Sequence, residues 1–207
     1  MWWDKRRDKG GDVSSTWLVV GLGNPGDKYR FTRHNVGRDA VSMLAEAEGK
    51  KFRRDRSGLM LADLRMATET GEAQVHLAYS TTYMNVTGQP VAAFAHKKEI
   101  GADHILVLHD DLDLPPHTLR LKKGGGEGGH NGLRSLSSSL KTRDYLRLRM
   151  GVGRPPGRME AADYVLAVIP PKDREEWEIT EGRAADVVVE VIRKGLIAAQ
   201  RDLHSPT

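Results

Sequence analysis

Residues 17–24 have the sequence WLVVGLGN, an apolar run that ends in a glycine-rich turn and an asparagine. A short, continuous apolar run bounded by turn residues is typical of a buried strand. The polar residues 23–33 predict a loop, and helical spacing of apolar side chains then begins after Asn35, a candidate N-cap, and stops at Gly49. This order of strand, loop and helix predicts the first unit of an α/β fold.

The rest of the chain alternates strand-like and helix-like segments, with one hairpin inserted. This alternation predicts a single-domain three-layer α/β sandwich, in which a mixed, mostly parallel, twisted sheet is flanked by helices. Residues 1–15 are expected to be a disordered leader, and residues 16–204 the folded domain. The expected strands are 59–66, 73–79, 104–109, 118–123 and 145–152, and the expected helices are 86–98, 133–140 and 174–203.

The composition limits the class of protein. Of the 207 residues, 39% are hydrophobic and 29% are charged, as in a folded domain rather than a disordered chain. The absence of cysteine excludes disulfides, thiolate metal sites and a cysteine nucleophile. No apolar run approaches the roughly 18 residues that span a bilayer, and no signal peptide is recognisable, so we expect a cytoplasmic protein. A net charge of +4 mildly favours polyanionic partners.

Polar side chains follow several of the expected strands. Ligands of open α/β folds bind at the carboxyl ends of the strands, so these side chains are candidates for one shared site. They are Asn24, Asn85, Asp110 and Asn131, together with His34 at the entry to the first helix.

A histidine and a carboxylate have a clear chemical use in such a site. His34 can act as a general base near neutral pH, and Asp110 on its other ring nitrogen would fix the tautomer and stabilise the imidazolium. A helix N-terminus beneath the ring would act in the opposite direction and lower its pKa. Amide groups suit the binding of an attacking water and of a developing oxyanion.

Each of these residues also has a purely structural interpretation. His34 could be a capping residue, Asp110 could cap a turn or bind a metal, and the asparagines are common in turns and N-caps. The remaining histidines have no metal-ligand spacing and are expected in surface or core positions, although His130 could support the neighbouring Asn131.

Four segments together resemble the bacterial-type peptidyl-tRNA hydrolase family. Any one of them is a weak signal, but their common order and spacing form a specific signature. They are VVGLGNPGDKYRFTRHNVG (19–37), STTYMNVTGQPV (80–91), HDDLDLPPHTLRLKKGGGEGGHNGL (109–133) and YLRLRMGVGRP (145–155).

The resemblance implies an esterase that cleaves the peptide from peptidyl-tRNAs released by stalled translation, as a monomer and without a metal or other cofactor. His34 would be the base that activates water, with Asp110 as its support, and Asn24 would distinguish blocked from free aminoacyl groups. The remaining implied substrate contacts are Asn85 and Asn131 at the peptide–tRNA junction, and Tyr29 and Tyr83 at the tRNA end.

Basic residues around the glycine loop (124–129) would contact tRNA phosphates. Arg147 and Arg149 alternate along one expected strand, and period-two spacing places them on one face. The alternative is a charged, solvated strand. The full set is Arg120, Lys122, Lys123, Arg147 and Arg149.

Three residues depart from the family pattern. Tyr83 stands where phenylalanine is frequent, Asp111 where glutamate is common, and Glu127 interrupts the glycine loop. None of them belongs to the expected catalytic set.

Other functions are less compatible with the sequence. Gly21, Gly23 and Gly26 form a G-x-G-x-x-G pattern, but no helix opens within it, which disfavours a dinucleotide site. No G-x-S-x-G or H-E-x-x-H motif supports a serine hydrolase or a metalloesterase. A non-catalytic RNA-binding protein on the same fold is the remaining alternative, and retention of the histidine, the aspartate and the asparagines favours an enzyme.

Overall fold

The computed structural model describes residues 15–205. The expected leader lies outside this part of the chain except for Ser15, which already belongs to the first strand. The strands are β1 (Ser15–Gly21), β2 (Arg53–Arg54), β3 (Leu59–Thr68), β4 (Gly71–Ser80), β5 (Ile105–Asp111), β6 (Leu119–Lys123) and β7 (Leu146–Gly151). The α-helices are α1 (Val36–Ala47), α2 (Gly88–Lys97), α3 (Asn131–Leu140), α4 (Ala161–Leu166), α5 (Arg174–Lys194) and α6 (Leu196–His204).

The strands form one mixed sheet in the order β2-β3-β4-β1-β5-β7-β6. Its four central strands β4, β1, β5 and β7 are parallel, whereas the edges are antiparallel additions. The hairpin of β3 and β4 and the position of β1 in the sheet centre confirm the expected α/β architecture. The carboxyl ends of β1 and β5 are neighbours, since Gly21 pairs with Leu108.

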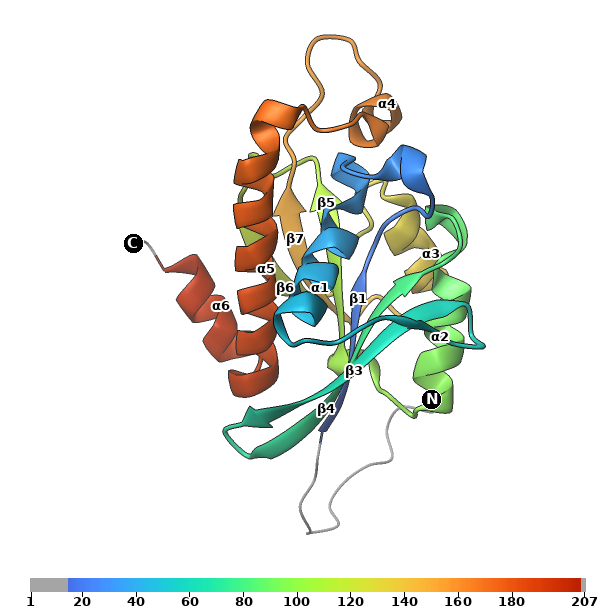
Figure 1. Cartoon of the computed structure of the whole chain (residues 1–207), viewed down its shortest axis with the longest axis vertical. Helices are drawn as coiled ribbons and strands as arrows, with labels where there is room; N and C mark the ends of the chain where they lie inside the picture. Colours follow the sequence, from blue (N-terminus) through green and yellow to red (C-terminus); the bar gives the residue numbers. More distant parts are fainter. Residues whose placement is uncertain (1–14, 206–207) are drawn as a thin grey trace.

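Helices cover both faces of the sheet and make the fold three-layered (Figure 1). Alternate residues of β1 enter two different cores: Val19 packs with α1 and α5, and Val20 packs with α2 and α3. A strand that is buried on both faces must be apolar at every position, which explains the continuous apolar run of residues 17–22.

Some of the expected helices differ from the structure. The helix expected over 174–203 is two helices, because Gly195 adopts a positive φ of 81° between α5 and α6. The helix expected from residue 86 begins as a 3-10 turn at Met84–Val86, and α2 follows from Gly88. The short helix α4 was not expected from the sequence.

Helix α1 lies unusually close to the sheet because two glycines meet there. A Cβ atom on Gly37 would lie 2.2 Å from the carbonyl oxygen of Leu108 in β5, and one on Gly21 would lie 2.4 Å from the carbonyl oxygen of Gly37. Any side chain at Gly37 would therefore push the start of α1 away from the end of β5. His34 and Asp110 stand on the two sides of this contact.

We predict that Gly37→Ala lowers the free energy of unfolding by about 1–3 kcal/mol, because the added methyl overpacks the contact with the Leu108 backbone. Urea denaturation measures the loss. Gly182→Ala is the matched control, because Gly182 lies within α5 with no atom near its absent Cβ. This control should raise stability by about 0.5–1 kcal/mol through helix propensity. Equal stabilities for the two variants would contradict the prediction.

Candidate active site

A cavity of about 770 Å³ opens where the carboxyl ends of the central strands meet the glycine loop. It brings together the residues that the sequence placed at strand ends and at the entry to α1. Those that line it are Asn24, His34, Asn85, Asp110 and Asn131.

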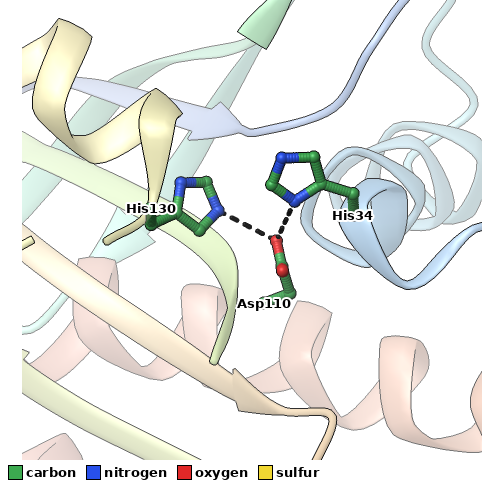
Figure 2. Close-up of side chains that lie close together, drawn as sticks. All are labelled: His34, Asp110 and His130. Atoms are coloured by element: carbon green, nitrogen blue, oxygen red, sulfur yellow. Dashed lines mark hydrogen bonds and ion pairs between the residues drawn. The ribbon is translucent and has the colours of Figure 1, made fainter. Parts of the chain in front are cut away.

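The centre of the site is one carboxylate oxygen that two histidines share. Oδ1 of Asp110 lies 2.9 Å from Nδ1 of His34 and 2.9 Å from Nε2 of His130 (Figure 2). The two rings come from different segments, His34 from a 3-10 turn before α1 and His130 from the residue before α3. All three side chains are almost completely buried.

The hydrogen bonds determine which nitrogens carry protons. Nδ1 of His130 accepts from the backbone N–H groups of Gly132 and Leu133, so the proton of this ring is on Nε2, which donates to Asp110. Nδ1 of His34 donates to the same carboxylate. In neutral His34 this leaves the lone pair on Nε2, which points away from Asp110 in Figure 2. The arrangement presents a base to the cavity.

The charges of the site shift the pKa values of the pair in opposite directions. Burial opposes the ionisation of Asp110, but the two histidines outweigh it and hold the pKa of this carboxyl well below its ordinary value of 3.8. Burial also opposes the protonation of His34, and the negative charge and hydrogen bond of Asp110 more than offset it, so the pKa of His34 lies above 6.5. The lowering that a helix N-terminus would cause is therefore not the dominant effect.

His109 forms a second layer behind the carboxylate. Its Nδ1 donates to the carbonyl oxygen of Asp110 at 2.7 Å, and its ring packs edge-on against His130. Burial, together with the nearby His130, lowers the pKa of His109 to about 3. His109 is therefore neutral at physiological pH and does not compete with His34 for the negative charge of Asp110.

Asn24 is buried, and both its side chain and its backbone are hydrogen-bonded. Its Oδ1 accepts from the backbone N–H of Met84 at 2.8 Å, which leaves the Nδ2 amino group as its available donor in the cavity. The side chain of Asn35 bonds both the N–H and the carbonyl of Asn24, and Arg38 donates to the same carbonyl. Asn35 was expected to be an N-cap, but its side chain makes no capping bond and instead fixes the Asn24 loop.

The other predicted substrate contacts lie at the mouth of the cavity. Asn85 and Asn131 are exposed, and Oδ1 of Asn131 accepts from Arg134 at 3.3 Å. Tyr83 lines the cavity and is 54% exposed, with Tyr29 packed edge-on against it at 6.3 Å between ring centroids. Tyr29 itself stands just outside the lining.

Arg147, which was predicted to contact tRNA phosphates, lines the cavity, but much of its guanidinium is occupied by the glycine loop (124–129). The residue is 1% exposed, and its guanidinium donates to the carbonyl oxygens of Gly125 and Gly126. Arg147 therefore holds the glycine loop (124–129) in place from below. Period-two spacing correctly assigned its face of the strand but gave no information about what covers that face.

The remaining basic residues divide between two faces of β6. Arg120 and Lys122 pair with Arg149 and Arg147 across the strands, so these four share a face, and Lys123 points the opposite way. Arg149 and Lys122 line the cavity. Nε of Arg149 donates to Asp111 at 2.7 Å, so the aspartate that departs from the family pattern orients a cation of the site.

Several parts of the site were not recognised from the sequence. The bond of His130 to Asp110, the bonds of Asn35 to Asn24 and the wall formed by α4 each depend on contacts between distant segments, and His130 was expected only as a support of Asn131. Val165 and Leu166 of α4 and Leu112 give the cavity an apolar side opposite its polar groups. The segment 161–169 (AADYVLAVI) is largely apolar, but it is too short to show a clear helical period, so α4 was not recognised.

His34, Asp110 and His130 also have the spacing of a candidate metal site, since their ligand atoms lie within 4.8 Å of one another. The bonds that these three side chains make favour a hydrogen-bonded cluster over a metal site. Both rings direct an N–H group at one oxygen, and the second nitrogen of His130 is used by the start of α3. An ion would have to displace both N–H groups.

The fold and the site together define an α/β enzyme in which a histidine–carboxylate pair faces a cavity with amide donors and basic residues. The chain belongs to the peptidyl-tRNA hydrolase family, whose model matches residues 18–207. It is 51% identical to the peptidyl-tRNA hydrolase of Nocardia farcinica (90% of this chain, 95% of the relative) and 47% identical to that of Kineococcus radiotolerans (94% and 100%). The crystal structure of peptidyl-tRNA hydrolase from Acinetobacter baumannii has a TM-score of 0.80 at 33% identity, covering 95% of this chain and 98% of that one.

We predict that Asp110→Asn lowers the pKa of His34 from above to below 6.5, because burial of the ring remains while the charge that offsets it is removed. NMR titration of the imidazole C–H signals measures the shift. Asp63→Asn is the matched control, because Asp63 forms a similar contact with His76 outside this cavity and should leave His34 unaffected. An unchanged pKa of His34 in Asp110→Asn would show that the pair is not electrostatically coupled.

Proposed function

We propose that this chain hydrolyses the ester bond between a peptide and the terminal ribose of its tRNA, with His34 as the general base. The observation that carries the proposal is the orientation of His34, whose Nδ1 is held by the buried Asp110 while the ring lines a large open cavity. Membership of the peptidyl-tRNA hydrolase family supplies the substrate class.

Nε2 of His34 takes a proton from a water molecule as the water oxygen attacks the ester carbonyl carbon. A tetrahedral intermediate with a negatively charged oxygen forms, and it collapses with cleavage of the bond from this carbon to the ribose oxygen. The ribose oxygen leaves with the proton held by His34, and the peptide leaves as a carboxylic acid that ionises in water. Asp110 stabilises the imidazolium between these two proton transfers.

The asparagines have different tasks in this scheme. Nδ2 of Asn24 remains available as a donor because the backbone N–H of Met84 already binds Oδ1 of the same side chain. This amino group suits the carbonyl oxygen of the amide that blocks the amino group of the aminoacyl residue. A free aminoacyl group lacks that carbonyl, so the contact favours peptidyl-tRNA. Asn85 and Asn131 at the cavity mouth suit the binding of the water and of the peptide–tRNA junction.

The basic side of the cavity suits the tRNA phosphates. Burial lowers the pKa of Lys122, and repulsion by the nearby Arg149 and Arg147 lowers it further. A bound phosphate would relieve this repulsion. The tyrosine pair Tyr29 and Tyr83 offers flat faces for the terminal bases.

The proposal includes a monomer, because the lining of the cavity comes from one chain. It also includes action in the cytoplasm, where translation would supply the peptidyl-tRNA. No helix within residues 15–205 combines the length and the apolar character that crossing a bilayer requires.

We predict that His34→Ala lowers kcat for N-acetylaminoacyl-tRNA by about 10²–10⁴-fold, because the variant loses its base. In the unmutated chain, kcat should fall as the pH drops through the raised pKa of His34, since only the neutral ring accepts a proton. The measurement is release of free tRNA across a pH series.

His96→Ala is a matched control, because His96 lies in α2 outside the cavity. Its activity should match that of the unmutated chain, and a strong chelator should leave that activity intact. Binding of the substrate without turnover by the unmutated chain would instead indicate a non-catalytic RNA-binding protein. Loss of activity on chelation would indicate a metal at the His34, Asp110 and His130 cluster.

We predict that Arg149→Gln raises KM for the tRNA substrate more than it lowers kcat, and reduces the salt dependence of binding by about one unit of slope. Lys123→Gln removes the same charge from the opposite face of β6 and should have a smaller effect. Steady-state kinetics at several salt concentrations compares the two variants. Equal KM values for Arg149→Gln and the unmutated chain would show that Arg149 does not contact the tRNA.

A further inference from the structure

A second cavity, here called the α1–α5 cleft, lies between two helices and is separate from the active site. Its volume is about 680 Å³, and it shares no lining residue with the active-site cavity. Helix α1 contributes Arg38 and the set Asp39, Ser42, Met43 and Glu46, and helix α5 contributes the set Arg174, Trp177, Glu178 and Glu181. Both sets have the spacing i, i+3, i+4 and i+7, so each helix presents one continuous face to the cleft.

Two carboxylates lie within this cleft without a partner. Glu181 is 8% exposed, and Asp39 is half-buried. Over the described part of the chain, neither carboxylate takes part in a hydrogen bond of the fold or in an ion pair. A buried carboxyl without a hydrogen-bonded partner is costly to ionise, so a cation that binds beside it would stabilise the ionised form and complete the site.

The arginines of the cleft form no ion pair with these acids, and the attraction of Arg38 and Arg30 for Asp39 does not outweigh the burial of this carboxyl. Arg38 donates to the carbonyl of Asn24 and stacks on Tyr79, with 4.3 Å from its guanidinium carbon to the ring centroid. Arg174 and Arg30 lie over the ring of Phe31. The lining contains five carboxyl groups and three guanidinium groups, so the cleft has an excess of negative charge when Asp39 and Glu181 are ionised.

We infer that the α1–α5 cleft is a binding site for a small organic cation, an ammonium or guanidinium group on an apolar body, with Glu181 and Asp39 as its anionic partners. The apolar body would pack against Trp177, Ile169 and Met43 in the lining. A bare metal ion fits less well, because the one group of three potential ligand atoms found in residues 15–205 is at His34, Asp110 and His130.

Proton uptake competes with such a ligand. Burial raises the pKa of Asp39 to about 6, and burial together with the charges of Asp39 and Glu178 raises that of Glu181 to about 8. Since only the ionised carboxylates attract a cation, affinity should increase from below pH 6 to above pH 8. The charged groups that face this pair are Asp27, Arg30, Arg38, Glu46, Arg174 and Glu178.

The test is calorimetric titration of the full chain with benzylamine, and with benzyl alcohol as the neutral analogue of the same shape. We expect saturable binding of benzylamine that strengthens toward high pH, and none of benzyl alcohol. Glu181→Gln keeps the side-chain shape and should weaken benzylamine binding by about tenfold or more. Glu175→Gln is the matched control, because Glu175 is exposed on the same helix outside the cleft.

The fold of the variant can be checked independently. Above pH 8 the unmutated chain must keep a buried carboxylate ionised, so Glu181→Gln should have an equal or higher Tm there. If Glu181→Gln fails to fold, Asp39→Asn carries the same test. Equal binding of amine and alcohol, unchanged binding in the carboxamide variants, or no binding of benzylamine at any pH would overturn the inference. Hydrolysis of peptidyl-tRNA should be unaffected in all three variants, which separates this site from the active site.

Discussion

The contact between α1 and the sheet at Gly37 is the constraint on which the active site depends. The backbone of the helix touches the carbonyl group of Leu108 with no room for a methyl group, and Asp110 is two residues further along β5. This contact sets the distance between the turn that carries His34 and the strand that carries Asp110. Because the hydrogen bond between them is 2.9 Å long, a displacement of one ångström would break it.

The buried carboxylate then organises the segments around it. Asp110 is buried away from water, and its carboxylate accepts hydrogen bonds from N–H groups of His34 and His130 instead. His130 uses its other nitrogen to cap α3, whose first residue is Asn131, so the position of this amide is linked to the carboxylate through one imidazole ring. The glycine loop is held from its other side by Arg147. Charge, helix capping and loop position are thus coupled through a few short contacts.

The sequence could predict the architecture and the residues at strand ends because both follow from local patterns. Alternating strands and helices indicate the fold, and Asn24 and Asp110 directly follow or end apolar runs that the structure confirms as central strands. The roles of Asn35 and Arg147 depend on what packs over them, which period and composition do not contain. Asn35 has the pattern of an N-cap but bonds a loop eleven residues earlier, and Arg147 alternates like an exposed cation but lies beneath the glycine loop.

Helix α1 also explains why two cavities can lie close together and remain separate. The turn before it carries His34 into the active site, while Asp39, little more than one turn further on, faces the cleft on the side of α5. Between them, Asn35 and Arg38 bond the backbone of Asn24, so one helical turn forms the wall between the cavity that holds His34 and the cleft that holds Asp39. A cation attracted to the cleft would find no carboxylate of the active site within reach of the same position, because the wall is made of side chains already committed to the Asn24 loop. The two cavities therefore take their polar groups from different sides of α1, and a ligand of one would not touch the residues that line the other.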